Sequence, residues 1–599
     1  MTPRTGLVLP PLFLAGALIL VAPLPVRSHS ADDRRFRVEA GDFAYRPADL
    51  SVHPGDTVRI DLVASDVVHG LWIDGYELEV VADPGRTETL TFVADRVGAF
   101  RIRCSVTCGP LHPFMVGRLI VGPDDEPFRA AALAVLAAAA GLILSLTGRR
   151  QVGSRADLLR SPRLRRLLRG RGLQLAVSGI LLVGLAFTIL AGLLGTPVGN
   201  RNFAIIFVWI VWWAALLWVA VPLLGRSWCS VCPLPLPGEW LQRGNMLGPD
   251  GSAFRGLGRR WPRRLRGLWL PIGLFALLAV FSVPILTRPQ VTSVVLAGLA
   301  LLAVAVSLIF ERRSFCRYLC PVGGFIGLYA QTAPLELRVK DPSLCARCAT
   351  KACYRGSPEG YGCPWLVFPG GLTKNTACGF CLECLRTCPS GNIAINLRPP
   401  AADLARPSRG LDEAVKTLVM LGAALAYAAV LFQGSGVFKT AANAPGTGAW
   451  VIYAVGLLGF LFLFVPGLFA VSVRTAQWIS RSQGAFRPAF AASAAALVPL
   501  GLMLWIAFTL GFVPTNASYI GPVLSDPLGW GWTLLGEASA SWKPAATLAL
   551  EKLQVLALAG GAFWAARTAR RIAVDTRLTP VPTVAFALGA TISMGWLLL

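Results

Sequence analysis

Ten stretches of the chain are almost wholly apolar and about 20 residues long, the length that an α-helix needs to cross a hydrocarbon core about 30 Å thick. Of the 599 residues, 54% are hydrophobic and 15% are charged, whereas soluble globular proteins contain about 25% charged residues. We therefore expect a multi-pass membrane protein. The expected spans lie near residues 129–147, 173–194, 204–224, 268–286, 294–310, 415–433, 450–473, 489–512, 549–566 and 581–599.

Arginine is distributed unevenly between the loops that join these spans. The loop at 148–172 carries nine Arg and the loop at 225–267 carries eight, whereas the alternate loops carry one or two basic residues. Basic loops of membrane proteins face the cytoplasm, which accounts for the net charge of +24 without nucleic acid binding. If residues 31–127 lie outside a cell membrane, the pattern closes over all ten spans and places the polar segment 340–398 inside.

The beginning of the chain differs from the rest. Residues 1–28 are typical of a signal peptide or an uncleaved anchor, and residues 31–127 carry 17 Asp and Glu against 10 Arg, a net charge of −7. Residues 33–122 alternate apolar and polar side chains between turns, which predicts an all-β sandwich. The expected domains are 1–28 (leader), 29–127 (sandwich), 128–339 (membrane), 340–400 (cysteine-rich) and 401–599 (membrane).

The stretch "CSVTCGPLHPFM" spaces two cysteines, a histidine and a methionine over residues 104–115. Two exported cysteines often form a disulfide, but thiolate, imidazole and thioether together select copper. One cysteine with His and a weak Met would give a mononuclear site, and two cysteines on one loop can instead bridge two coppers. A second imidazole is then required, and His69 in "SDVVHGLWI" is the candidate.

Three segments carry a family resemblance. "DVVHGLWI", "ADPGRTETLTFVADRVGAF" and "CSVTCGPLHPFMVGRLIV" together resemble the cupredoxin domain of cytochrome c oxidase subunit II, whose binuclear CuA loop also occurs in nitrous-oxide reductase. A single apolar segment precedes the domain here, where the oxidase subunit has a two-span hairpin, so we interpret the domain as one reused in another protein. The resemblance implies that the thiolates of Cys104 and Cys108 bridge the two coppers and that His69 and His112 are the terminal imidazoles. It also implies a weak axial thioether from Met115 and a backbone carbonyl ligand from Val106.

Eight further cysteines lie in "CARCATKACYRGSPEGYGCP" and "CGFCLECLRTCP". The second segment has the C-x₂-C-x₂-C-x₃-C-P spacing of bacterial ferredoxins, in which the fourth cysteine ligates the other of two clusters. Zinc is the alternative, which the Cys-Pro endings disfavour. The spacing predicts one [4Fe–4S] cluster on Cys363, Cys378, Cys381 and Cys384, and a second, with four residues where two are usual before Cys353, on Cys345, Cys348, Cys353 and Cys388.

The last four cysteines form two pairs, in "WCSVCP" (Cys229, Cys232) and "FCRYLCP" (Cys316, Cys320). Each pair follows an inward-running span and precedes proline, which favours a shared cofactor-binding role over inert thiols or disulfides. With the ferredoxin-type segment, residues 173–398 resemble the membrane polyferredoxins of the NapH, NosR and CcoG type. The first pair departs from the family's C-x₃-C-P spacing by one residue.

These parts predict a membrane electron-transfer protein that links cytoplasmic [4Fe–4S] clusters, or quinol, to an exported CuA centre. No substrate-converting site is recognisable. The acidic sandwich suggests a basic partner such as a soluble c-type cytochrome, or else a periplasmic reductase or oxidase. A factor that reduces or delivers copper for assembly of such an enzyme is the alternative. Because every histidine lies at or before residue 112, a bis-histidine haem cannot bridge the bilayer, which leaves a bound quinone, metal held by the Cys-Pro pairs, or a partner subunit.

Overall fold

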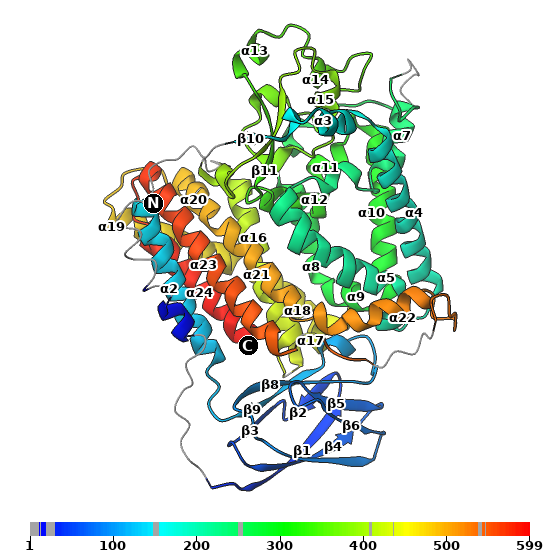
Figure 1. Ribbon diagram of the computed structural model, residues 1–599, viewed down its shortest axis with the longest axis vertical. Coiled ribbons are helices and arrows are strands. Elements are labelled where there is room, and N and C mark those ends of the chain that lie inside the picture. Colours follow the sequence, from blue (N-terminus) through cyan, green and yellow to red (C-terminus); the bar gives the residue numbers. More distant parts are fainter. Residues whose placement is uncertain are drawn as a thin grey trace.

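The computed structural model describes residue 11 and residues 14–19, 30–147, 155–249, 256–405, 410–434, 436–536, 542–545 and 547–599. A β-sandwich forms one end of the molecule, a helical body the middle, and a cysteine-rich cap the opposite end (Figure 1). The expected leader at 1–28 lies mostly outside the described residues. Within it, residues 14–19 are helical, and the Ile19 carbonyl accepts a hydrogen bond from Arg129 at 2.8 Å.

The sandwich consists of two sheets with strand orders β2-β1-β4-β7 and β3-β9-β8-β5-β6. The pairs β1–β4 and β3–β9 are parallel and the other pairs are antiparallel. Alternation of apolar side chains buries Ile60, Leu62 and Leu71 between the sheets, as expected for sheets packed face to face. The strands are β1 (Asp33–Gly41), β2 (Ala44–Arg46), β3 (Asp49–Val52), β4 (Thr57–Ala64), β5 (His69–Ile73), β6 (Leu78–Ala82), β7 (Thr87–Val93), β8 (Gly98–Arg103) and β9 (Val116–Val121).

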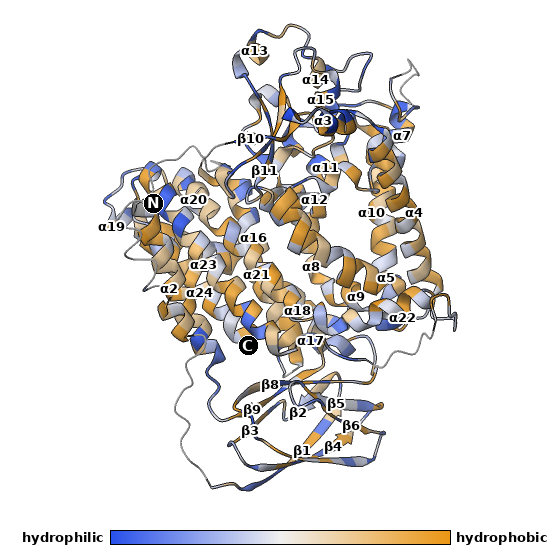
Figure 2. Cartoon of the chain, viewed as in Figure 1, coloured by the Kyte–Doolittle hydropathy of each residue, from blue (hydrophilic) through white to orange (hydrophobic). Residues whose placement is uncertain are grey.

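Most of the hydrophobic residues lie in the helical body (Figure 2). Within the described residues, eight helical segments are long and apolar enough to span a membrane. They are Glu126–Ser145, Gly172–Leu194, Phe203–Leu224, Pro289–Ile309, Leu411–Phe432, Gly448–Ile479, Phe486–Leu510 and Val581–Leu598. In Figure 1 they comprise α2 (Glu126–Thr147), α4 (Gly172–Leu194), α5 (Phe203–Ile205) with its continuation to Leu224, α10 (Pro289–Ile309), α16 (Leu411–Phe432), α18 (Gly448–Gly459) with α19 (Val465–Ile479), α20 (Phe486–Ala494) with α21 (Val498–Leu510), and α24 (Val581–Leu598).

The two remaining expected spans differ from this pattern. Residues 268–286 are divided into α8 (Trp269–Val280) and α9 (Ser282–Thr287), and neither piece is long enough to cross a bilayer alone. Residues 549–566 lie within the 30-residue helix α23 (Thr547–Thr576), where Glu551 and Lys552 interrupt the apolar sequence. Among the described residues, the body therefore contains eight apolar spans by length and composition, where the sequence analysis expected about ten.

The span that begins with α5 is wound unusually. It continues as two π-helical segments, η4 (Ile206–Trp212) and η5 (Ala215–Leu224), the second containing Pro222. Proline removes a backbone donor and so disturbs the regular hydrogen-bond pattern. π-Helical turns are rare and are found frequently at functional sites, which makes this span notable.

The cap is built around a small sheet of order β10-β12-β11, formed by β10 (Ala156–Asp157), β11 (Leu335–Val339) and β12 (Ile393–Leu397). β11 and β12 pair antiparallel, so the two ends of the cysteine-rich segment lie side by side. Between them lie α13 (Pro342–Arg347), α14 (Ala352–Arg355) and α15 (Glu383–Thr387). The Cys-Pro pairs lie just beneath the cap, on α6 (Trp228–Val231), α11 (Ser314–Tyr318) and the start of α12 (Pro321–Tyr329).

Candidate metal centres

Strand pairing brings the candidate copper ligands together. β8 and β9 pair with Arg103 opposite Val116. Cys104 comes directly after β8, and Met115 comes directly before β9. The Cys104 amide donates to the Met115 carbonyl at 3.3 Å, which closes the loop 104–115 at its base. His69 begins β5, which pairs with β8 in the same sheet, so its imidazole lies beside this loop.

The five candidate side chains form one buried group. The Sγ atoms of Cys104 and Cys108 are 3.7 Å apart, much farther than a disulfide bond of about 2.05 Å, and both thiols are free. His69 Nδ1 lies 4.0 Å from Cys104 Sγ, and His112 Nδ1 lies 3.9 Å from Cys108 Sγ. Met115 Sδ lies 3.8 Å from Cys108 Sγ. Each thiol therefore has one imidazole beside it, and the Met115 thioether lies beside the Cys108 thiol.

The Val106 carbonyl also faces this group, accepting from Cys104 Sγ at 3.0 Å. Because a carbonyl belongs to the backbone, this contact does not depend on the valine side chain. The donor set of two thiols, two imidazoles, one thioether and one carbonyl fits a soft metal such as copper. Of the described residues, His69, Cys104 and Cys108 form the one group of three or more candidate ligands whose atoms all lie within 4.8 Å of one another.

The contact between the two thiols shifts their pKa values in opposite directions. The hydrogen bond between them lowers the pKa of Cys104 well below its usual value and raises that of Cys108. Two buried thiols 3.7 Å apart share one site for negative charge, so a cation between them is needed before both can ionise. A copper pair would supply that charge, since metal-bound thiols are deprotonated.

Outer partners hold both imidazoles by their Nε2 atoms. His69 Nε2 lies 2.6 Å from Asp66 Oδ1, and His112 Nε2 lies 3.2 Å from the hydroxyl of Tyr519. These contacts leave each Nδ1 free to face the thiols, the arrangement by which metal-ligating histidines are usually oriented. Sequence reasoning did not identify either partner: Asp66 is one of many acidic residues in the sandwich, and Tyr519 is more than 400 positions from its histidine.

Further contacts seat the copper loop on the helical body. Lys439, in α17 (Val437–Asn443), donates from Nζ to the Phe114 carbonyl at 2.6 Å, and Asn200 donates to Thr107 Oγ1 at 2.8 Å. Burial lowers the pKa of Lys439 to about 8. The copper ligands consequently face the helical body and are closed off from the surface, with His69 at 0% and His112 at 3% exposure.

In the cap, the eight cysteines fall into two groups. Burial raises the pKa of Cys353 to about 12, with further contributions from Cys388, Cys345 and Cys348 in that order, and the smallest from Cys363. Asn392 joins two of these thiols, donating from Nδ2 to Cys345 Sγ and from its amide to Cys388 Sγ, both at 3.3 Å. The structure thus gathers the set Cys345, Cys348, Cys353 and Cys388.

The second group is more deeply buried. Burial raises the pKa of Cys384 well above its usual value, and the thiols of Cys381, Cys378 and Cys363 add to that rise in this order, with the smallest contribution from Cys353. One zinc ion holds its sulfur ligands about 2.3 Å away, so any two lie at most about 4.6 Å apart. No three of the cap's cysteines, all of them described, lie within 4.8 Å of one another. Neither group is arranged around a single ion, and the wider spacing fits iron–sulfur clusters.

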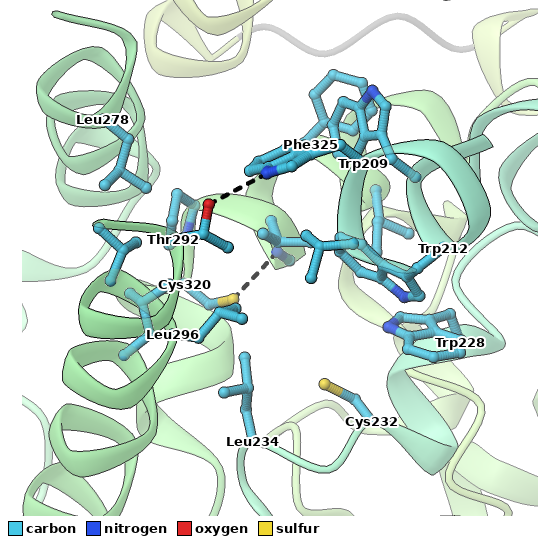
Figure 3. Close-up of a pocket in the computed structure, with 18 of the residues that line it drawn as sticks. Trp209, Trp212, Trp228, Cys232, Leu234, Leu278, Thr292, Leu296, Cys320 and Phe325 are labelled. Carbon is cyan, nitrogen blue, oxygen red and sulfur yellow. Dashed lines mark hydrogen bonds between the residues drawn. The ribbon is translucent and has the colours of Figure 1, made fainter. Parts of the chain in front are cut away.

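The Cys-Pro pairs, 84 residues apart at Cys232 and Cys316, line one cavity together (Figure 3). Cys320 caps α12, and its Sγ accepts the Gly323 amide at 3.1 Å. Burial raises the pKa of Cys320 to about 11, and nearby Cys229 contributes to that rise. Burial likewise raises the pKa of Cys316, and Cys320, Cys232 and Cys229 all contribute. The four thiols form a third group.

Two buried arginines fasten the loops that carry this third group. Arg313 donates to the Cys229 carbonyl at 2.7 Å and pairs with Glu239 at 2.6 Å. Arg226 donates to the Cys316 carbonyl at 3.4 Å and also bonds Thr376 in the cap. Both guanidinium groups are positively charged and lie beside the third group, where they would balance the negative charge of cysteine thiolates that held a cluster. The cap group at Cys363 adjoins this site, because Trp365 lines the same cavity.

Comparison with known proteins assigns the sandwich. Residues 39–121 match the family of cytochrome c oxidase subunit II, periplasmic domain. A cytochrome c oxidase subunit 2 of Thermus thermophilus is 30% identical over 120 residues, which cover 18% of this chain and 89% of that protein. Through this domain, the chain belongs to the cytochrome c oxidase subunit II family. A nitrous-oxide reductase of Stutzerimonas stutzeri is 33% identical over 84 residues, 13% of each chain.

A second family matches the membrane part. Residues 205–268 and 292–340 match a family described as a 4Fe-4S binding domain, and these segments contain the two Cys-Pro pairs. The methylamine utilization ferredoxin-type protein MauN of Paracoccus denitrificans is 28% identical over 159 residues, 24% of this chain and 51% of that protein. The chain is an electron-transfer membrane protein that combines a copper-type cupredoxin sandwich with an iron–sulfur part, as the sequence analysis predicted.

Proposed function

We propose that this protein carries electrons across the membrane between iron–sulfur clusters at the cap and a binuclear CuA centre in the sandwich. The observation that carries the proposal is the sorting of all fourteen cysteines to opposite ends of the helical body. Cys104 and Cys108, with two imidazoles and a thioether, follow β8 in the sandwich at one end, and the other twelve lie on or beside α6, α11 and the cap elements at the other end (Figure 1).

The residues present fit the proposed groups. His69, Cys104, Cys108, His112, Met115 and the Val106 carbonyl would hold two coppers, and the two cap sets would each hold a [4Fe–4S] cluster. We extend the proposal to a third iron–sulfur centre on Cys229, Cys232, Cys316 and Cys320, supported by their convergence on one cavity and by the family match over both segments. When bound, all these groups supply one-electron transfer without bond making.

We further propose that the sandwich is exported and that the cap faces the cytoplasm of a multi-pass cell membrane protein. The arginine-rich loop that contains α3 (Pro162–Arg169) lies at the cap end, where Arg171 pairs with Glu383 at 2.8 Å, and basic loops favour the cytoplasmic side. The −7 charge of residues 31–127 would steer a basic exported partner, such as a soluble c-type cytochrome or a periplasmic reductase or oxidase.

Burial of the copper ligands weighs against the alternative of copper delivery. A delivery factor must pass its ion to another protein, so its ligands need to be reachable. Here Cys104, His112 and Met115 are at most 3% exposed and are covered by the helical body. A fixed electron-transfer centre has no such requirement, because electrons tunnel through the surrounding protein.

Metal analysis and electron paramagnetic resonance of the full-length protein test the proposal. We expect about two coppers and about twelve irons per chain, because three clusters would each hold four irons. Cys108→Ser should abolish the binuclear copper signal and leave the iron content unchanged, whereas Cys320→Ser should remove about four irons and spare the copper. Ser105→Ala, in the copper loop but outside the ligand set, is the matched control.

Two results would contradict the proposal. Native protein with copper that chelators remove readily and that shows no mixed-valence signal would point to copper handling. Iron near eight per chain, unaffected by Cys320→Ser, would remove the third centre from the proposal while leaving the two cap clusters.

A further inference from the structure

One cavity of about 220 Å³ runs through the helical body from the cap side toward the sandwich. The thiols of Cys232 and Cys320 project into one end (Figure 3), and Phe512 lines its wall as well. The ring of Phe512 lies 5.8 Å from that of Phe114, which sits in the copper loop between His112 and Met115. The cavity therefore reaches from the third thiol group to a ring in contact with the copper loop.

Aromatic side chains form a continuous wall along this path. Each ring lies within contact distance of the next, a separation at which aromatic pairs attract one another. The successive centroid distances are 5.8, 5.4, 5.9, 6.1, 6.1 and 5.8 Å along Phe114, Phe512, Phe508, Trp505, Trp213, Trp212 and Trp228. Trp228 precedes Cys229 directly. Flat apolar walls of this kind favour a flat apolar ligand.

The wall also contains an unpartnered hydroxyl. Ser282, at the break between α8 and α9, is 3% exposed, and its Oγ has no hydrogen-bond partner among the described residues. Tyr427 and Tyr453 lie next to it, yet neither makes a hydrogen bond of ordinary geometry with it. A buried hydroxyl without a partner costs stability, and because Ser282 lines the cavity, its hydroxyl is placed to donate to an acceptor atom there.

The cavity's lining excludes several kinds of ligand. None of its described lining residues is Asp, Glu, His, Lys or Arg, so nothing there would bind a charged ligand or ligate a haem iron through imidazole. The cluster proposed on the Cys-Pro thiols would fill the end of the cavity that those thiols line, so a substituted six-membered ring would bind in the remainder, along the aromatic wall. What fits is a neutral, flat, redox-active ring that carries a hydrogen-bond acceptor.

We propose that this cavity binds the ring of a membrane quinone as a resident electron carrier, with one ring carbonyl accepting a hydrogen bond from Ser282. The inference rests on the proposed function, whose reduced iron–sulfur centre and oxidised copper centre are the donor and acceptor. The ring takes one electron from the donor and passes the same electron to the acceptor. No bond forms or breaks and no proton is required, in keeping with described lining residues that include no carboxylate, imidazole or amine.

The position explains how electrons cross the body. The hydrocarbon core is about 30 Å thick, and among the described residues that line the cavity the Cys-Pro thiols are the only strong metal-ligating groups. The π-helical span supplies Trp209, Trp212 and Trp213 to the cavity wall, which gives its irregular winding a role. Lipid-facing α4 and α10 form the opposite wall, so a quinone tail has a short route to the bilayer.

The test uses full-length protein in lipid nanodiscs, titrated with decylubiquinone while tryptophan fluorescence is recorded. Six tryptophans line the cavity, so binding should quench fluorescence saturably, at one quinone per chain after removal of resident quinone. Leu296→Trp should fill the cavity and reduce the bound quinone at least tenfold. Leu301→Trp, on the same helix but 71% exposed, should bind like the native protein. Ser282→Ala should weaken binding about fivefold, as expected for one lost hydrogen bond.

Organic extraction of untreated protein gives an independent readout, and we expect quinone to copurify with native and Leu301→Trp protein but not with Leu296→Trp protein. Absence of extractable quinone together with unsaturable quenching would overturn the inference, as would equal binding by both tryptophan variants. Copper and iron are measured on the same samples. Protein that holds both metals but no quinone refutes this inference alone, whereas protein without the metals refutes the proposed function.

Discussion

At the scale of single residues, the copper loop is tied to the membrane part by side chains far away in the sequence. Tyr519 orients His112 through its hydroxyl at 3.2 Å, and Lys439 holds the Phe114 carbonyl at 2.6 Å. On the other side, Asp66 orients His69 at 2.6 Å. The two imidazoles thus have different outer partners, a carboxylate from the sandwich and a phenol from the helical body.

Removing the phenol tests this dependence. Tyr519→Phe should keep the copper ligands intact but loosen the orientation of His112, and loss of such an outer partner typically lowers metal affinity 10- to 100-fold. Copper retention during titration with a Cu(I) chelator measures the effect. Tyr76→Phe is the control, because the Tyr76 hydroxyl bonds the Arg96 carbonyl at 3.3 Å, away from the site. Equal retention in both variants would contradict a role for Tyr519.

At the scale of elements, the irregular spacing before Cys353 has a structural explanation. Lys351 adopts a left-handed backbone conformation with φ of 46° and caps the short helix α14, which carries Cys353. The turn takes up the extra residues and directs Cys353 toward Cys345, Cys348 and Cys388. A ferredoxin-type set therefore forms in spite of the departure from the usual spacing.

A pair of substitutions at this turn distinguishes backbone strain from side-chain effects. Left-handed conformation costs a residue with Cβ about 1 kcal/mol and costs glycine little. Lys351→Gly should therefore preserve iron at the Cys345 set, whereas the β-branched Lys351→Val should speed iron loss to a chelator several-fold. Both variants remove the ammonium group, so equal iron loss from both would attribute the effect to charge and contradict the role of the turn.

At the scale of the whole molecule, the helical body separates the sandwich, which carries the candidate copper ligands, from the cap, which carries the candidate cluster ligands (Figure 1). In the part of the chain that the structure describes, eight apolar spans form that body. The divided helix α8–α9 and the polar start of α23 lie where the sequence analysis expected two more spans. Both exceptions have local causes: Pro284 cannot donate a backbone hydrogen bond to Val280, where α8 ends, and charged residues interrupt the second span.

Epitope insertion tests which side of the membrane each end faces. One epitope is inserted after Gly85, in the turn between β6 and β7 where a side chain would project into open space, and another between the exposed residues Pro358 and Glu359 of the cap. In bacterial spheroplasts, antibody should reach the first epitope in intact cells and the second only after permeabilisation. Each insertion serves as the control for the other, and the reverse pattern would contradict the proposed orientation.

Much of the architecture was predictable because its signals are local. Period-two alternation indicated the sandwich, and apolar length indicated most of the spans. The copper loop and the ferredoxin-type run are short enough for spacing alone to bring their sulfur atoms within reach of one metal group. Tyr519, Lys439 and Ser282 could not be found in this way, because their roles come from contacts between distant parts of the chain.

The sequence by itself determined the donor types, their spacing and the membrane character of the chain, since these depend on neighbours within one loop or one helix. Only the tertiary structure decided that Cys229 and Cys232 meet Cys316 and Cys320 at one cavity, and that Phe512 brings this cavity into contact with the copper loop. The physical reason is that helix packing juxtaposes residues through the shapes of many side chains at once, and no single periodicity or spacing encodes that arrangement.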